Sequence, residues 1–100
     1  VRNGSLLPAL PAEAVVEVGC RVDGDGIHPW PIAPVTGEML GLIAQVKAAD
    51  QLAIAAALRG SRTLAWRAFA AHPLVDSIGV AKKLVDGYAS RFPEVGRLLA

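Results

Sequence analysis

Few side chains in this 100-residue sequence combine type and spacing in a way that could support chemistry. Asp23, Asp25 and Gly26 are spaced like the start of a calcium-binding loop. Such a loop needs further oxygen ligands and a glutamate at its twelfth position, whereas proline and tryptophan follow here. We therefore predict a hairpin turn over residues 23–26, since Asp-Gly pairs readily adopt the positive φ that tight turns need.

Thiol and metal chemistry have little support. Cys20 is the single cysteine, which excludes an internal disulfide and an all-cysteine metal site. His28 and His72 are distant from each other in sequence and lack the spacing of a zinc finger. We expect Cys20 to be a half-buried structural thiol, and we assign no metal ligand in the chain.

Catalytic groups are also absent from the pattern. The sequence contains no glycine-rich phosphate loop and no nucleophile elbow, and its carboxylates form no pair on one face. His28 and Trp30 lie beside the predicted turn, where they can contact a substrate or a partner, or simply pack together. His72 precedes Pro73, and its imidazole is predicted to bond the last carbonyls of a helix. No catalytic or cofactor-binding residue is assigned, and His28 and Trp30 are the candidates for a substrate-side or interface surface.

The composition limits the class of protein. Apolar residues make up 53% and charged residues 19%, and the formal net charge is +1. This balance argues against a nucleic-acid or anionic-membrane surface, which needs clustered basic charge. The most apolar stretch, residues 39–58, contains Gln45, Lys47, Asp50 and Gln51, so we expect no membrane-spanning helix. Because ordinary soluble domains are less apolar, we expect further protein to cover part of this surface.

Residues 1–35 favour strands and extended segments. Asn3-Gly4 is a strong two-residue hairpin signal. Residues 14–22 alternate, with Val16, Val18, Cys20 and Val22 on one side, which predicts a strand. Residues 27–32 predict a short return strand, confined to an edge because of Pro29 and Pro31.

From Thr36 onward the apolar period becomes helical. We predict a helix over residues 36–59 followed by Gly60 as its C′ residue, and a second over residues 62–71 capped by Ser61. A third is capped by Asp76 or Ser77 and ended by Pro93. The long helix is apolar on nearly every face, which indicates burial on several sides. The predicted fold class is α+β: one domain over residues 1–100, β or extended over 1–35 and helical over 36–92, with three helices.

Taken in order, these segments resemble the C-terminal region of glycoside hydrolase family 4. The segments that carry the resemblance are Asn3-Gly4 to Leu10-Pro11, Ala14 to Val18, Gly26 to Pro29, Val46 to Ala48, Leu52 to Ile54, Gly60, and His72 to Val75. The His-Pro-Leu-Val form of the last segment is more similar to the 6-phospho-β-glucosidase branch. The sequence departs from the family pattern at Ala49, Ala55 and Ser61, where Tyr, Glu and Asp are common.

The resemblance implies a much longer enzyme built like lactate and malate dehydrogenases. Its N-terminal domain would bind NAD, and a divalent metal, usually manganese, would take part in a redox-elimination that cleaves the glycosidic bond of a phosphorylated sugar. The family's metal ligands, catalytic tyrosine and NAD loop lie upstream of the region this chain resembles, so the chain alone is expected to be inactive. The resemblance further implies a cytoplasmic homo-oligomer, in which the long helix packs against the N-terminal NAD-binding domain and a second subunit.

Two other functions fit the residues. A stand-alone helical module could dimerise through its apolar helix faces without catalysing a reaction. A small-ligand binder could use His28 and Trp30, in which case saturable binding would be lost in His28→Ala.

Overall fold

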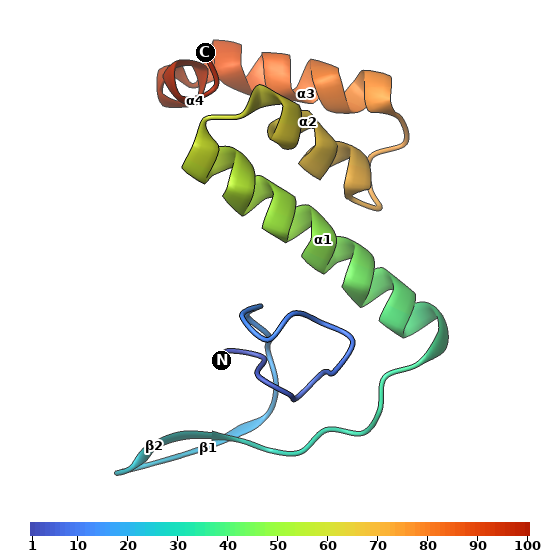
Figure 1. Cartoon of the computed structure of the whole chain (residues 1–100), viewed down its shortest axis with the longest axis vertical. Helices are drawn as coiled ribbons and strands as arrows, with labels where there is room; N and C mark the ends of the chain where they lie inside the picture. The colour runs from blue at the N-terminus through green and yellow to red at the C-terminus, as the bar shows by residue number, and fades with distance from the viewer. The chain divides into compact units, whose positions relative to one another are not determined.

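The computed structural model describes residues 1–100, which form two compact units, residues 1–41 and residues 42–100. Two strands, β1 (Cys20–Asp23) and β2 (Gly26–Pro29), precede four helices (Figure 1). The long helix α1 (Gly37–Arg59) begins in the first unit and continues into the second. The protein is therefore α+β, with a short hairpin followed by helices, and the predicted fold class is confirmed.

The first sixteen residues form a wide closed loop. An antiparallel bridge joins Arg2 to Val15, and the amide of Asn3 donates to the carbonyl of Ala14 at 2.7 Å. Gly4 has a φ of 55°, but Asn3-Gly4 does not form the predicted two-residue hairpin turn. The chain returns only after ten further residues, because a side-chain interaction of Asn3 replaces the short turn.

Asn3 is 1% exposed and organises this loop. Its side-chain amide nitrogen donates to the carbonyls of Leu7, Leu10 and Pro11 at 3.0–3.1 Å. Its side-chain oxygen accepts from the backbone N–H of Leu7 at 2.8 Å. One side chain therefore contacts four buried or partly buried backbone groups, and it is the hydrogen-bond partner of two that have no backbone partner, the carbonyl of Leu10 and the amide of Leu7.

The hairpin β1–β2 is antiparallel, with Val22 opposite Ile27 and Asp23 opposite Gly26. The turn predicted over residues 23–26 is confirmed, and Gly26 has a φ of 126°. The first strand begins at Cys20 and is shorter than the predicted strand over residues 14–22. Residues 16–19 lie between the Arg2–Val15 bridge and the pairing with β2, and they belong to neither. Val16 is buried, whereas Val22, on the same predicted face, is 71% exposed. The alternation of apolar and polar residues therefore extends further along the chain than the burial of that face.

The helix α1 ends as the sequence predicts. Gly60 has a φ of 58°, and the amide of Ser61 donates to the carbonyl of Ala56 at 3.0 Å. The predicted burial on several sides is not met within this chain, because only Ala49 and Ala56 of α1 are buried. Leu58 is 82% exposed.

Three further helices complete the second unit: α2 (Arg62–Ala71), α3 (Ile78–Arg91) and α4 (Pro93–Leu98). The side-chain oxygens of Ser61 and Ser77 accept the amides of Leu64 and Val80 as N-caps, at 3.3 and 3.2 Å. The helix α4 is additional to the three predicted helices, because Pro93 both ends α3 and occupies the first position of α4.

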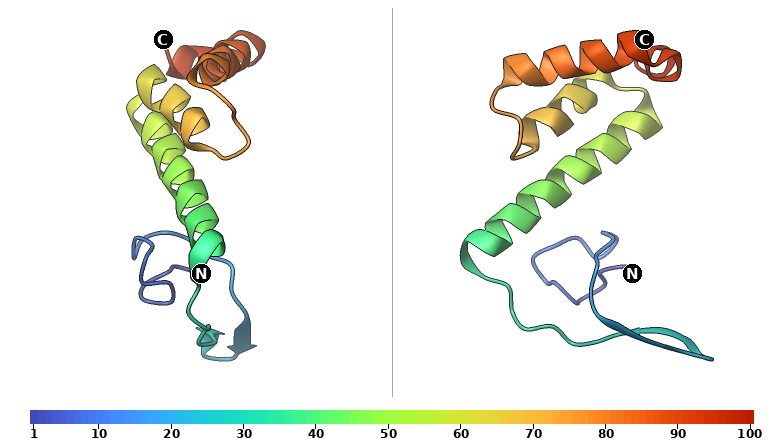
Figure 2. Two further views of the ribbon diagram at one scale, coloured as in Figure 1. Left: turned by 90° about the vertical axis from the view of Figure 1, so that its right-hand side faces the viewer. Right: turned by 180° about the vertical axis from the view of Figure 1, so that it is seen from behind.

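The second unit packs α2 along α3, and α4 against the end of α3 (Figure 2). Its buried core consists of Ala56, Ala65, Val85 and Leu99. Ala81 is fully buried on α3. Trp66 packs against this core, and the ammonium of Lys82 lies 5.2 Å from the centre of its ring. This confirms the helical prediction for residues 62–71 and places Trp66 in the packing of the unit.

Candidate functional site

The hairpin brings the two sequence candidates onto one face. The side chains of residues directly opposite each other in an antiparallel pair point to the same side of the sheet. Along each strand, every second side chain points to that same side. Arg21 lies opposite His28, and Trp30 donates its backbone N–H to the carbonyl of Gly19 at 2.9 Å. The polar face of the hairpin, as we call this side, therefore carries Arg21, Asp23, His28 and Trp30.

Asp23 connects the charged groups of the polar face. One carboxylate oxygen accepts from the guanidinium of Arg21. The other carboxylate oxygen accepts a hydrogen bond from the backbone N–H of Asp25 at 3.0 Å. The same oxygen lies 2.9 Å from Nε2 of His28. Because Arg21 and His28 are well exposed, these interactions fix the positions of the side chains more than they stabilise the fold.

Trp30 rests on the backbone of the opposite strand. A Cβ atom placed on Gly19 would lie 3.1 Å from Cε3 of Trp30, so the absence of a side chain at position 19 lets the ring approach the backbone there. The ring is nevertheless 59% exposed. The result is an open aromatic and ionic surface, which can contact a ligand or another protein but encloses no reacting group.

The opposite side of the hairpin, its apolar face, carries Cys20, Val22, Ile27 and Pro29. Val22 and Ile27 are exposed. Cys20 is half-buried, as predicted, and its thiol lies 3.3 Å from the carbonyl of Val18. This face is available for apolar contacts.

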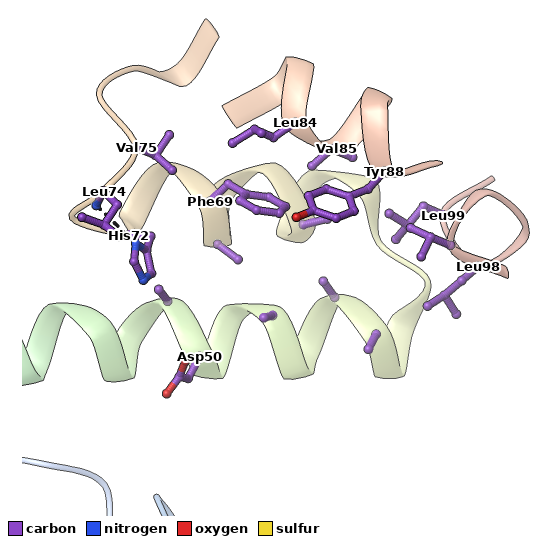
Figure 3. A pocket seen from close by; sticks show the side chains of 17 residues that line it. Asp50, Phe69, His72, Leu74, Val75, Leu84, Val85, Tyr88, Leu98 and Leu99 are labelled. Carbon is purple, nitrogen blue, oxygen red and sulfur yellow. Dashed lines mark hydrogen bonds between the residues drawn. The ribbon is translucent and has the colours of Figure 1, made fainter. Parts of the chain in front are cut away.

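The second unit contains an apolar groove of about 520 Å³ between α1 and the other helices (Figure 3). Phe69, Leu84, Val85 and Tyr88 form its upper wall, and His72 lies at one end, with Leu98 and Leu99 at the other. The α1 wall is formed mainly by alanines 49, 53, 56 and 57. With so few polar groups, the groove suits apolar side chains or an apolar ligand.

Sequence reasoning did not find this groove. It arises because α1 presents mainly alanines toward the bulky side chains of α2 and α3, so the facing helices do not fill the space. Alanines at positions 49, 53 and 57, on one face of a long helix, were the available signal. Phe69 and Tyr88 stack with ring centres 5.7 Å apart, and Phe92 continues the stack at 5.8 Å.

His72 does not act as predicted. Its backbone N–H caps α2 by donating to the carbonyl of Phe69 at 3.1 Å, but its imidazole does not bond the last carbonyls. Instead Nδ1 accepts the backbone N–H of Leu74 at 3.2 Å. The reason is that the chain turns at Pro73, which brings the amide of Leu74 back to the ring.

The side chains of this chain do not fit NAD or a divalent metal. No group of three or more His, Cys, Asp and Glu side chains is placed to hold a metal ion, and Asp23 with His28 is only a pair. The sequence offers no glycine-rich loop between a strand and a helix to bind a dinucleotide. These residues therefore support no chemical step that uses either group.

The helix α1 satisfies a coarse criterion for crossing a membrane. It has 23 residues, a mean hydropathy of 1.2 over its most apolar window, and 11% of that window buried. The sequence expectation that its four polar residues would exclude such a helix is therefore not supported by length and composition. The criterion is weak, since a core helix of a soluble protein also meets it.

Two comparisons place the chain among known proteins. Residues 1–75 match the model of the family 4 glycosyl hydrolase C-terminal domain. The chain is 31% identical over 84 residues to a probable 6-phospho-beta-glucosidase of Bacillus subtilis (strain 168), covering 84% of this chain and 19% of that protein. It is 32% identical over 85 residues to a 6-phospho-beta-glucosidase of Thermotoga maritima, covering 85% of this chain and 20% of that protein.

The chain thus spans about a fifth of the length of the curated relatives it matches. The family match includes the closed loop, the hairpin, α1 and α2, together with the segment His72–Val75. With three quarters of its residues in that match, the chain belongs to the family 4 glycosyl hydrolases, as a C-terminal domain of that family.

Proposed function

We propose that this chain is the C-terminal part of a cytoplasmic enzyme that hydrolyses O-glycosidic bonds of phosphorylated sugars, in the manner of a 6-phospho-β-glucosidase. The observation that carries the proposal is the similarity, over more than four fifths of the chain, to two proteins described as 6-phospho-beta-glucosidases. The reaction would be the NAD- and metal-dependent redox-elimination of the family, with manganese as the expected metal. Both groups would be held by segments outside these 100 residues.

The role of the chain would be to complete the enzyme by packing and contact. The groove and the exposed Leu58 and Ile54 of α1 are apolar surfaces that an N-terminal NAD-binding domain and a second subunit would cover. Covering apolar surface contributes about 25 cal/mol per Å². The polar face of the hairpin would supply the substrate-side or interface contacts of His28 and Trp30.

A chimeric enzyme tests this proposal. The corresponding C-terminal segment of the Bacillus subtilis relative is replaced by this chain, and turnover of an aryl 6-phospho-β-glucoside is measured with NAD and manganese. We expect the chimera to be active, and we expect the 100-residue chain alone to show no turnover. Turnover by the chain alone would contradict the assignment of the reacting groups to other segments.

The matched control is the relative truncated before the replaced segment. Loss of activity in the truncated protein and its recovery in the chimera support a role in completing the enzyme. If the chimera folds and binds NAD but never turns over substrate, the alternative of a non-catalytic helical interaction module is favoured.

The polar face gives a separate prediction. In the chimera, Trp30→Ala is expected to raise KM for the aryl substrate about fivefold if the ring stacks on the sugar, since aromatic contacts contribute on the order of 1 kcal/mol. If Trp30 instead lies in a subunit interface, KM stays unchanged and light scattering shows a smaller assembly. Val15→Ala, at another exposed apolar residue, is the control and should change neither quantity.

A further inference from the structure

The two edges of the hairpin differ in their capacity for strand pairing. Hydrogen-bonded and non-hydrogen-bonded pairs alternate along an antiparallel ladder. The bond from Trp30 N–H to the Gly19 carbonyl makes that pair a hydrogen-bonded one. Arg21 with His28 and Asp23 with Gly26 follow as hydrogen-bonded pairs. The backbone groups of the intervening residues therefore point outward, away from the partner strand.

Prolines close the outer edge of β2. The outward positions of that strand and its continuation are Ile27, Pro29 and Pro31, so two of three outward donors are missing. The outward positions of β1 and the turn are Cys20, Val22 and Gly24, and all three retain their N–H groups. No backbone hydrogen bond links this outer edge of β1 to another segment of the chain. Within these 100 residues, one edge is thus blocked and the other is open.

The charges of Arg21 and Asp23 favour a second copy of β1 as the partner of the open edge. When two copies of β1 pair antiparallel about a two-fold axis, an axis at Val22 places Arg21 of each copy opposite Asp23 of the other. An axis shifted by one residue, to Arg21, would place Arg21 opposite Arg21, and an axis at Asp23 would place Asp23 opposite Asp23. Like charges directly opposite are unfavourable in a sheet, whereas opposite charges stabilise it.

The directions of the backbone hydrogen-bonding groups favour the same register, centred on Val22. Because the amide and carbonyl of Val22 point outward, two copies of Val22 can form a hydrogen-bonded pair with each other. Their side chains, 71% exposed, would meet on the apolar face beside Ile27. A contact of this kind is isologous, so it closes after two copies.

We infer that the outer edge of β1 pairs with β1 of a second copy of this chain, in an antiparallel register centred on Val22. The two hairpins become one four-stranded sheet with the order β2-β1-β1-β2. This explains how a hairpin with four-residue strands persists, since two-stranded hairpins are marginal in water and three or more strands are needed for independent stability. The inference names one surface of the oligomer in the proposed function, but it is tested by association alone.

Cross-linking of the 100-residue chain tests the register. In a Cys20→Ser background, Val22→Cys is expected to form a disulfide between copies on mild oxidation, because hydrogen-bonded partners lie about 5.5 Å apart at Cα. Ile27→Cys in the same background is the control. Ile27 is 60% exposed, but it sits on β2, three strand spacings from its copy, so it should remain a thiol.

Three cross-linking results would overturn the inference. Equal disulfide formation at positions 22 and 27 would indicate random collision. Disulfide formation through Cys20 in the unaltered chain would place the axis at Cys20 instead. Absence of any disulfide at position 22, in a sample that light scattering shows to be dimeric, would place the interface elsewhere.

Charge reversal supplies an independent measurement. Arg21→Glu is expected to raise the dissociation constant of the dimer about tenfold or more, because two attractive pairs become repulsive. The double variant R21E/D23K restores the opposite charges between copies and should recover most of the association. If R21E leaves the dissociation constant unchanged, or if R21E/D23K is no tighter than R21E, the register is wrong. Loss of the chimera's activity with the dimer intact would count against the proposed function and leave this inference standing.

Discussion

Replacing Asn3 by alanine is expected to lower the free energy of unfolding of the first unit by about 2–4 kcal/mol. The side chain of Asn3 forms four hydrogen bonds, to the carbonyls of Leu7, Leu10 and Pro11 and to the amide of Leu7. The carbonyls of Leu7 and Pro11 also accept the amides of Leu10 and Ala14, so the substitution leaves two groups without a partner, the carbonyl of Leu10 and the amide of Leu7. Each such buried group costs about 1–2 kcal/mol. The expected result is loss of amide-exchange protection over residues 1–16, together with an earlier denaturation transition.

Two variants make this prediction specific. Asn3→Asp keeps the acceptor for the Leu7 amide but removes the donors to three carbonyls, so it should be at least as destabilising as alanine at neutral pH. Ser5→Ala, at an exposed neighbour in the same loop, should change the free energy of unfolding by less than about 0.5 kcal/mol. If Asn3→Ala leaves the protection of residues 1–16 intact, the loop is held by its apolar residues and not by Asn3.

The second large effect is expected at Gly60, between α1 and α2. Its φ of 58° lies in the left-handed region, where a side chain costs about 1–2 kcal/mol. A Cβ atom there would also lie 2.7 Å from the carbonyl oxygen of Leu98, which is backbone and has little freedom to move. Gly60→Ala is therefore expected to lower the free energy of unfolding of the second unit by about 2–4 kcal/mol.

Gly87→Ala is the matched control for this substitution. Gly87 lies inside α3, and an added Cβ would meet nothing within 4 Å. Alanine there should stabilise the unit by about 0.5–1 kcal/mol, because it reduces the freedom of the unfolded chain. Chemical denaturation of the two variants should thus shift the midpoint in opposite directions. Equal and small shifts would show that the approach of Gly60 to Leu98 is not maintained in solution.

The features that the sequence predicts well are the local ones. Gly60 and Ser61 set helix ends through contacts with residues three to five positions away, and Gly26 supplies the positive φ of the turn at residues 23–26. The resemblance to family 4 also rests on such short segments in order. These predictions do not require knowing which residues far apart in the sequence are in contact in the fold.

The features that were missed depend on residues far apart in the chain. The buried Asn3 reaches carbonyls up to eight positions away, so its pairing with Gly4 was a misleading turn signal. The groove depends on the distance between α1 and the α2–α3 pair, which alanine spacing alone does not fix. The polar face of the hairpin required the register, because only the pairing of Arg21 with His28 shows which side chains share a side.

The positions of the two tryptophans have a practical consequence. Trp30 lies on the hairpin of the first unit, 59% exposed beside Gly19, whereas Trp66 packs on the core of the second unit under Lys82. Each unit therefore carries its own intrinsic fluorophore. Single-tryptophan proteins, made with Trp30→Phe or Trp66→Phe, report the melting of one unit at a time. The separation between the two emission transitions measures directly how far the N-terminal loop and hairpin fold independently of the helices.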